Sequence, residues 1–243
     1  MANIYGVLPV LEALRAGTKR IDRIVIAEGA RDSRLRQLID AARGAGVPIR
    51  REPRVTLDRL TQNGNHQGVL AITSAADYAD ADDLLTSITP QTLFVLLDGV
   101  EDPHNLGAII RTAECAGATG VIVPERRAAH LTDIVAKTSA GAVNYLPVAR
   151  VTNLAVFIES LKKLNVWVIG VEQSGATNYH EFDYSGPIAL VFGGEGSGLH
   201  RLVRERCDVL VSIPMRGKVS SLNVSVAVGV VMFEALRQRS SKK

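Results

Sequence analysis

The chain has 243 residues, of which 47% are hydrophobic and 5% aromatic, and its formal net charge at pH 7 is +3. No apolar run approaches the roughly 18 residues of a transmembrane helix, and the first residues lack the basic-then-apolar pattern of a signal peptide. Only two cysteines occur, Cys115 and Cys207, outside any CxxC pair, which argues against a disulfide scaffold or a cysteine zinc site and indicates a reducing, cytoplasmic environment.

The first 75 residues are expected to form a small α/β domain, because helix-like and strand-like apolar patterns alternate along them. The expected helices cover residues 7–14 and 35–42, and the expected strands cover residues 21–26, 47–49 and 68–72. Residues 76–90 contain four Asp and no Lys or Arg. Because this segment is small, acidic and poorly periodic, we expect it to be a linker.

Arginine dominates the charge of this first domain. Residues 1–75 hold twelve Lys or Arg, eleven of them Arg, against seven Asp or Glu. A guanidinium group presents a planar fork of donors that suits phosphates and base edges, so these residues favour an RNA partner. The alternative is a solvated surface that happens to use arginine, and charge alone leaves both interpretations open.

From residue 91 onward a longer alternation predicts a second α/β domain, residues 91–243, with a mostly parallel sheet. Its first strand, residues 93–97, is a continuous apolar run, as is typical of a parallel strand covered on both faces. Further strands are expected at residues 120–123, 166–169, 188–192 and 209–213, and helices at residues 105–117, 152–164 and 222–237. Asn105 is expected to cap the first of these helices.

A first polar motif, residues 102–113, follows the first strand of the second domain. It includes Asn105 and Arg111. Open α/β sheets usually bind ligands at the carboxyl ends of their strands, where this loop lies. Arg111 has apolar neighbours, and a charged group in such surroundings needs a partner or a ligand. The alternative is an ordinary surface arginine.

A second motif is the glycine-rich turn GGEGSG at residues 193–198, between a strand and a helix start. Glycines allow a backbone to approach a ligand closely. Such turns often bind phosphates, but Glu195 would repel a polyanion, so a cationic or neutral ligand fits better. S-adenosylmethionine carries a sulfonium and no phosphate. Taken alone, this motif is equally compatible with a plain tight turn.

The third motif, residues 213–227, is a strand end, a glycine-containing loop and a helix start. Ser220 and Ser221 are expected at the helix N-cap, and Ser221 and Asn223 flank the apolar Leu222. Capping explains one serine. It leaves the other polar side chains at this helix start available for a site.

These segments, NLGAIIRTA, LVFGGEGSGL and IPMRGKVSSLNVSVA, resemble in order and spacing the three signature motifs of the SpoU/TrmH family of RNA ribose 2′-O-methyltransferases. Residues 4–6 (IYG) and 66–68 (HQG) are similar to parts of that family's substrate-binding domain, so the resemblance covers nearly the whole chain. Within the family the chain most resembles the RlmB subgroup, which methylates a guanosine ribose in 23S rRNA.

The resemblance implies a small α/β RNA-binding domain followed by a knotted, SPOUT-type α/β methyltransferase domain that uses S-adenosylmethionine and no metal. Arg111 is implied to meet the ribose and its phosphate. The other polar active-site positions are then Asn105, Glu195, Ser221 and Asn223. The implied cofactor-binding residues are Gly193, Gly194, Gly196, Ile213, Met215 and Leu222.

The resemblance also implies a homodimer, for which the apolar positions Val226, Val230, Phe233 and Leu236 of the last helix offer a surface, unless they pack in the chain's own core. Two rival functions are a non-catalytic RNA-binding module and a phosphate-binding nucleotide enzyme. The first has no use for the third motif, and the second should not place Glu195 in its turn. Within the family, a tRNA 2′-O-methylase or a resistance-type rRNA methylase is the alternative.

Overall fold

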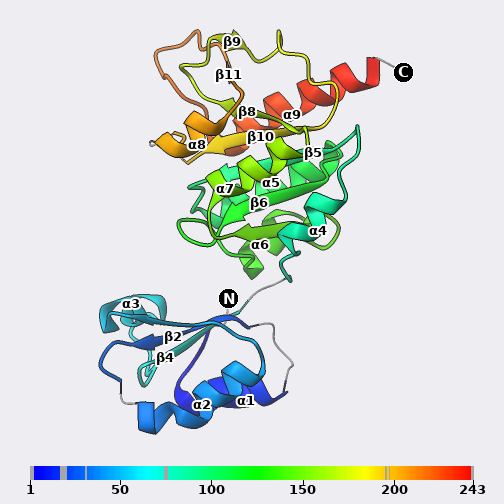
Figure 1. Cartoon of the computed structure of the whole chain (residues 1–243). Helices are drawn as coiled ribbons and strands as arrows, with labels where there is room; N and C mark the ends of the chain where they lie inside the picture. The colour runs from blue at the N-terminus through cyan, green and yellow to red at the C-terminus, as the bar shows by residue number, and fades with distance from the viewer. Residues whose placement is uncertain are drawn as a thin grey trace. The chain divides into compact units, whose positions relative to one another are not determined.

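The computed structural model describes residues 3–16, 21–30, 32–73, 76–194, 196 and 198–241. The chain divides into two compact units, Met1–Asp77 and Tyr78–Lys243, which Figure 1 shows in blue to cyan and in green to red. Both units are α/β, as the alternation of patterns predicted. Each is described by itself.

The first unit contains a four-stranded mixed sheet in the order β1-β4-β2-β3. Strand β2 is parallel to β3 and antiparallel to β4, which is itself antiparallel to β1. Helices α1 and α2 pack on one face, around Val10, Ile24 and Leu38, and α3 contributes Leu57 to the other. The bounds are β1 (Ile4–Tyr5), α1 (Val7–Ala16), β2 (Ile21–Ala27), α2 (Asp32–Gly44), β3 (Ile49–Glu52), α3 (Arg54–Leu60) and β4 (Val69–Thr73).

A buried histidine fastens α3 to β4 in this unit. His66 is 2% exposed, and its Nδ1 accepts a hydrogen bond from Gly68 N–H at 3.0 Å. The other ring nitrogen, Nε2, therefore carries the proton and donates to Asp58 Oδ1 at 2.8 Å. Gln67 Oε1 accepts from Val7 N–H at 3.2 Å and connects the same turn to α1. The HQG segment thus has a structural role.

The structure differs from the expected linker at residues 76–90. Helix α4 (Ala81–Thr86) lies within this segment, and Asp80 caps it by accepting from Asp82 N–H at 2.9 Å. Leu84 is buried in the core of the second unit, with Leu85 and Ile88 packed against the same cluster. Apolar side chains at helical spacing thus attach residues 78–90 to the second unit.

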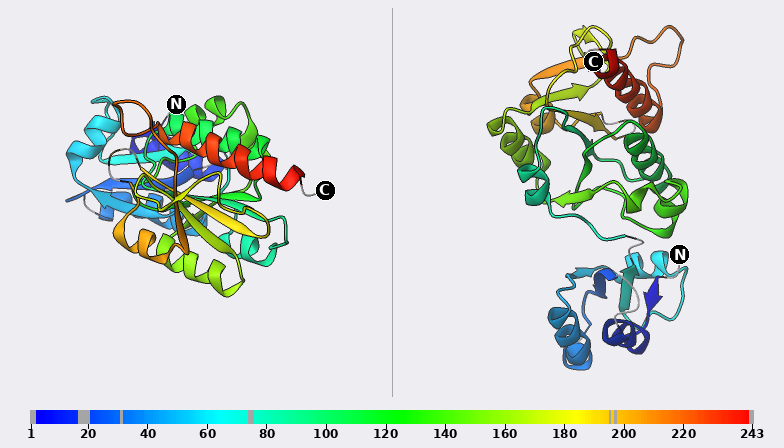
Figure 2. Two further views of the ribbon diagram at one scale, coloured as in Figure 1. Left: turned by 90° about the horizontal axis from the view of Figure 1, so that it is seen from above. Right: turned by 90° about the vertical axis from the view of Figure 1, so that its right-hand side faces the viewer.

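The second unit is built on a seven-stranded sheet in the order β7-β6-β5-β10-β8-β11-β9, and every strand pair in it is parallel. Helices α5, α6 and α9 cover one face, and α4, α7 and α8 cover the other (Figure 2). The bounds are β5 (Leu93–Asp98), α5 (Pro103–Cys115), β6 (Gly120–Pro124), α6 (Asp133–Thr138), the 3-10 helix η1 (Ala142–Asn144), β7 (Val148–Val151), α7 (Leu154–Lys163), β8 (Trp167–Val171), β9 (Thr177–Asn178), β10 (Ile188–Gly193), α8 (Arg201–Arg206), β11 (Val209–Ser212) and α9 (Val224–Ser241).

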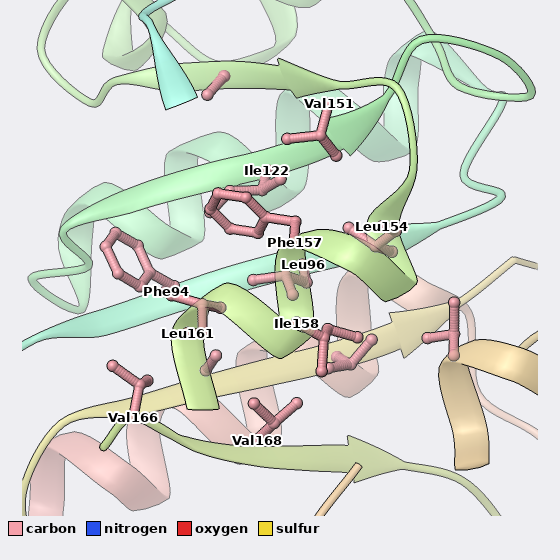
Figure 3. Packing of buried hydrophobic residues seen from close by; sticks show 14 of the residues in the cluster. Phe94, Leu96, Ile122, Val151, Leu154, Phe157, Ile158, Leu161, Val166 and Val168 are labelled. Carbon is pink, nitrogen blue, oxygen red and sulfur yellow. The ribbon is translucent and has the colours of Figure 1, made fainter. Parts of the chain in front are cut away.

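One part of the core of the second unit lies between the central strands and α7. Phe94 and Leu96 of β5 pack against Phe157, Ile158 and Leu161 of this helix, as Figure 3 shows. Each of these side chains is at most 6% exposed, and full burial of a large apolar side chain contributes about 1.5–3 kcal/mol. The sheet is therefore held rigidly behind the loops at its carboxyl edge.

Two helix starts lie elsewhere than expected. Helix α5 begins at Pro103, and its cap is Asp102, which accepts from His104 N–H at 3.0 Å. The expectation that Asn105 is the cap is wrong, because a better cap with proline behind it comes earlier. Helix α9 begins at Val224, after both serines.

At the start of α9, the side-chain oxygen that caps the helix belongs to Asn223 and not to a serine. Asn223 Oδ1 accepts from Ser225 N–H at 2.9 Å. The expectation that Ser220 or Ser221 caps the helix is therefore wrong. Among the residues that the structure describes, no helix has both the length and the apolarity needed to cross a membrane.

Candidate active site

A cavity of about 690 Å³ lies where β8, β10 and β11 end. Parallel strands place their carboxyl ends at one edge of the sheet, so the loops that follow them converge there. The volume is in the range of small-molecule sites. The lining residues are Val171, Glu172, Gln173, Phe192, Gly193, Gly194, Gly196, Gly198, Ile213, Met215, Ser220, Ser221, Leu222, Asn223, Val224 and Ala227.

The structure brings together every expected cofactor-binding residue in this cavity. Gly193, Gly194 and Gly196 come from the turn after β10, and Ile213, Met215 and Leu222 come from the segment between β11 and α9. Ser221 and Asn223 line the same space. The second and third motifs therefore form one site.

The glycine-rich turn needs its glycines for space and for backbone conformation. A Cβ at Gly193 would collide with the backbone of Gly198, and a Cβ at Gly194 with the carbonyl of Gly99. Gly196 has a φ of +81°, in the left-handed region that glycine adopts without strain. The described glycines of the turn therefore line the cavity with backbone alone. Glu195, which lies in this turn, is outside the described residues.

Glu172 is a lining residue that the motifs in the sequence did not reveal. Its Oε2 accepts from Arg204 Nε at 2.7 Å and from Ser174 Oγ at 2.8 Å, which fixes the carboxylate at the cavity wall. A Cβ at Gly198 would lie 3.3 Å from the other oxygen, Oε1. The available signal was its position directly after β8, at the carboxyl edge of the sheet.

An amide pair joins the first motif to the third. Asn105, which is 9% exposed, accepts at Oδ1 a hydrogen bond from Asn223 Nδ2 at 3.0 Å. Asn223 Oδ1 accepts from both N–H and Oγ of Ser225, at 2.9 and 2.6 Å. Because these two donors identify the oxygen end of the Asn223 amide, its nitrogen must face Asn105. The pair thus borders the cavity through Asn223.

Arg111 lies on α5, six positions after Asn105, and its side chain is exposed. It makes no hydrogen bond or ion pair with the residues that the structure describes, and it is not among the residues that line the cavity. The apolar surroundings expected for Arg111 are not found, because the residue is exposed to solvent. This position leaves it accessible to a large anionic ligand.

No group of three or more His, Cys, Asp or Glu suited to a metal ion occurs in the described parts of the chain. The polar groups at the cavity are amides, two serine hydroxyls, a carboxylate and backbone N–H and C=O groups. Such groups can bind a small cationic or neutral molecule, orient it and order a second reactant beside it.

Comparison with protein families finds two matches in chain order. Residues 3–79 match the model described as RNA 2′-O ribose methyltransferase substrate binding, and residues 92–233 match the SpoU rRNA Methylase family. The second match alone covers more than half of the chain. These spans agree with the two units of the structure.

Full-length relatives are similarly close. The chain is 45% identical over 246 residues to the 23S rRNA (guanosine-2′-O-)-methyltransferase RlmB of Pseudomonas syringae pv. tomato, covering 100% of this chain and 98% of the relative. It is 44% identical over 240 residues to YacO of Bacillus subtilis, named as a TrmH family tRNA/rRNA methyltransferase, covering 98% and 96%.

Among solved structures, the SpoU methyltransferase AviRb of Streptomyces viridochromogenes, in complex with AdoMet, superimposes with a TM-score of 0.64 at 27% identity, covering 98% of this chain and 90% of AviRb. An AdoMet-bound rRNA methyltransferase of Sinorhizobium meliloti gives 0.61 at 29% identity, covering 97% and 86%. The chain belongs to the SpoU rRNA methylase family of RNA 2′-O-ribose methyltransferases.

Proposed function

We propose that this chain transfers a methyl group from S-adenosylmethionine to a ribose 2′-hydroxyl of RNA, and that its substrate is a guanosine of 23S rRNA. The observation that carries the proposal is the cavity in which the glycine-rich turn and the segment before α9 meet, bordered by the Asn105–Asn223 pair. The choice of 23S rRNA rests on relatives named RlmB at 42–45% identity.

The cavity fits S-adenosylmethionine in shape and charge. Gly193, Gly194 and Gly196 line the cavity without side chains, and the side chains of Ile213, Met215 and Leu222 suit a flat adenine ring. The Glu172 carboxylate favours positive charge. When bound, the cofactor supplies a methyl group on a positively charged sulfur, which is a good leaving group.

The chain's own residues must align the ribose hydroxyl with that methyl group and ease removal of its proton. Asn223, oriented by Ser225 and bonded to Asn105, holds the start of α9 in place beside the cavity. The Ser221 hydroxyl lines the same cavity and can orient the ribose.

Arg111 binds the phosphate next to the target ribose and stabilises negative charge there. A guanidinium does not deprotonate in proteins, so Arg111 acts through its charge and its donors and not as the base. Its exposure leaves it open to RNA. We assign Glu195 to the active site on the family motif alone.

The first unit binds the RNA through its arginines. The affinity for RNA falls as salt rises. Replacing both Arg50 and Arg51 with Gln should make the plot of log affinity against log salt less steep, by about 0.7 for each phosphate of single-stranded RNA that the variant no longer neutralises. Lys163→Gln, which removes one positive charge at an exposed position of α7, is the control and should leave the slope unchanged. Equal slopes for all the proteins would contradict this role.

We also propose a homodimer through α9, and a cytoplasmic location in keeping with two free thiols. Val226 and Phe233 are each 50% exposed, whereas Val224, Val228 and Val231 pack in the chain's own core. Val230 and Leu236 are partly buried. Light scattering at micromolar concentration should give the mass of a dimer, and a monomer mass would contradict it. The knotted path of the second domain stays a prediction.

Methyl transfer from tritiated S-adenosylmethionine to purified 23S rRNA and to purified tRNA, measured side by side, tests the substrate. We expect label in 23S rRNA. The tRNA alternative has support, because other relatives are named only as tRNA/rRNA methyltransferases. Label in tRNA alone would favour it. A stabilising thermal shift with ATP and none with S-adenosylmethionine would indicate a nucleotide enzyme instead.

A further inference from the structure

Asp98, the last residue of the central strand β5, bonds to both ends of the glycine-rich turn. Its backbone carbonyl accepts from Gly194 N–H at 2.8 Å, where the turn begins. Its side chain, in a residue only 6% exposed, accepts from His200 N–H at 2.7 Å through Oδ2 and from His200 Nδ1 at 2.9 Å through Oδ1. His200 lies two residues after the turn, directly before α8.

A third side chain determines which ring nitrogen of His200 carries the proton. Arg127 Nη1 lies 3.3 Å from His200 Nε2. A guanidinium can only donate, so Nε2 accepts and the ring proton is on Nδ1, where it is donated to Asp98. Arg127 itself has a φ of 56°, an uncommon conformation for a residue other than glycine, and surrounding contacts usually hold such residues in place.

These bonds hold the ends of a segment whose ordering costs much conformational entropy. Glycine loses more backbone freedom on folding than other residues, and the turn contains four of them. Between its fixed ends the described residues are joined by a bond from Gly198 N–H to Gly194 O at 3.2 Å. Anchors that order the turn before a ligand arrives remove that entropy from the cost of binding.

We infer that Asp98 and His200 are a positioning pair that holds the glycine-rich turn in the shape that binds S-adenosylmethionine. The inference rests on the proposed function, since it takes the cavity lined by this turn as the cofactor site. The pair acts through the turn and does not touch the reacting atoms. None of the three family motifs includes Asp98 or His200.

Substitutions at His200 separate the two ring nitrogens. The amide nitrogen of His200→Asn can take the place of Nδ1 and donate to Asp98. In His200→Gln the amide reaches the position of Nε2, and the side-chain bond to Asp98 is lost. In His200→Ala the bonds of both ring nitrogens are lost. His180→Ala, at an exposed histidine of the same unit, is the matched control.

The measurements are the Kd for S-adenosylmethionine by calorimetry on the full chain, and kcat and KM with the cofactor varied at saturating RNA. For the Ala and Gln variants we expect Kd and KM to rise about tenfold, the loss of one hydrogen bond to a charged group, with kcat near the wild-type value. The Asn variant should stay within about threefold of wild type, and the control should be unchanged.

Asp98→Asn, tested alone and with His200→Ala, provides a second route if a His200 variant folds poorly. The two side chains share the bond between His200 Nδ1 and Asp98 Oδ1, so their losses should not add, and the double variant should bind no more weakly than the weaker single variant. Wild-type Kd values in all variants would overturn the positioning pair alone. A normal Kd with a large loss of kcat in His200→Asn would assign His200 to proton transfer instead. Failure of the wild-type chain to bind S-adenosylmethionine would overturn the proposed function as well.

Discussion

Asn223 Nδ2 donates a hydrogen bond to Asn105 Oδ1 at 3.0 Å, and this bond joins residues 118 positions apart in the sequence. It connects the first turn of α5 to the residue before α9, two helices that pack on the same face of the sheet. Asn223 also borders the cavity. The pair therefore couples the helix that carries Arg111 to the cavity proposed to bind the cofactor.

Asn223→Asp should lower methyl transfer and stability. The aspartate keeps an oxygen for Ser225 but places a second oxygen opposite Asn105 Oδ1 in place of the donor amide. Loss of this hydrogen bond, with two oxygens facing each other at a buried residue, costs about 1–3 kcal/mol. Urea unfolding and a turnover assay measure both effects. Asn153→Asp is the control, because Asn153 caps α7 through Oδ1 in the same way and aspartate caps equally well. Equal behaviour of the two variants would reduce Asn223 to a helix cap.

Arg111→Ala should abolish methyl transfer and leave the affinity for S-adenosylmethionine unchanged, because Arg111 does not line the cavity. Loss of one donor that stabilises developing charge typically lowers kcat by about 100- to 1,000-fold. Calorimetry and a turnover assay give the two readouts. Arg201→Ala, at an exposed arginine of α8 paired only with Glu205 in the described part of the chain, is the control. Wild-type turnover of Arg111→Ala would remove it from the active site.

Arg239→Met should destabilise the second unit by about 2–4 kcal/mol. The guanidinium donates to four carbonyl oxygens, those of Gln91, Thr92, Tyr184 and Gly186, at 2.6–3.2 Å. It fastens the end of α9 to the starts of the central strands. Burial lowers the pKa of Arg239 from its ordinary value.

The matched control for Arg239 is Arg237→Met, two positions earlier on the same helix. Arg237 is exposed and bonds only Glu234 among the described side chains, so its loss should lower the free energy of unfolding much less than the loss of Arg239. Urea denaturation at pH 7 compares the two. Equal free energies of unfolding for the two variants would show that water satisfies the four carbonyl oxygens as well as Arg239 does.

Cys207 should resist alkylation at pH 8 while Cys115 reacts. Burial, together with the nearby Asp208 carboxylate, raises the pKa of the Cys207 thiol to about 12. The reactive thiolate is therefore almost absent at any pH well below that value. Cys115 is exposed. Mass spectrometry after iodoacetamide treatment of the folded chain should find modification at Cys115 alone, and equal labelling of both would contradict the burial of Cys207.

The sequence was most informative where one local signal outweighed all others. The apolar run at residues 93–97 predicted a central parallel strand, and β5 is the third of the seven strands with neighbours on both sides. The glycine-rich turn was also recognisable, because no side chain fits at Gly193 or Gly194. The expected cofactor-binding residues line one cavity because the loops that carry them follow strands that end at the same edge of the sheet.

The misplaced helix starts show where local signals compete. Asp102, Asn105, Ser221 and Asn223 are all capping residue types, and only the path of the chain decides which of them caps. Proline at position 103 was the overlooked clue for α5. Helix α3 was missed because only Leu57 of its seven residues is buried, which leaves almost no periodicity.

The partnerships made by tertiary structure could not be predicted at all. Asp98 and His200 are 102 positions apart, and nothing near either residue indicates the other. Glu172 and Arg204 are likewise 32 positions apart. Parallel crossovers bring these residues to one edge of the sheet, and the register of neighbouring strands sets which of them meet.

The central claim is methylation of a ribose 2′-hydroxyl in 23S rRNA, and nucleoside mass spectrometry after reaction with S-adenosylmethionine tests it most directly. Unmethylated 23S rRNA is incubated with the wild-type chain and, in parallel, with Arg111→Ala. We expect one 2′-O-methylguanosine per rRNA with the wild-type chain and none with the variant. A methyl group on a base, or no methyl group in any RNA offered, would contradict it.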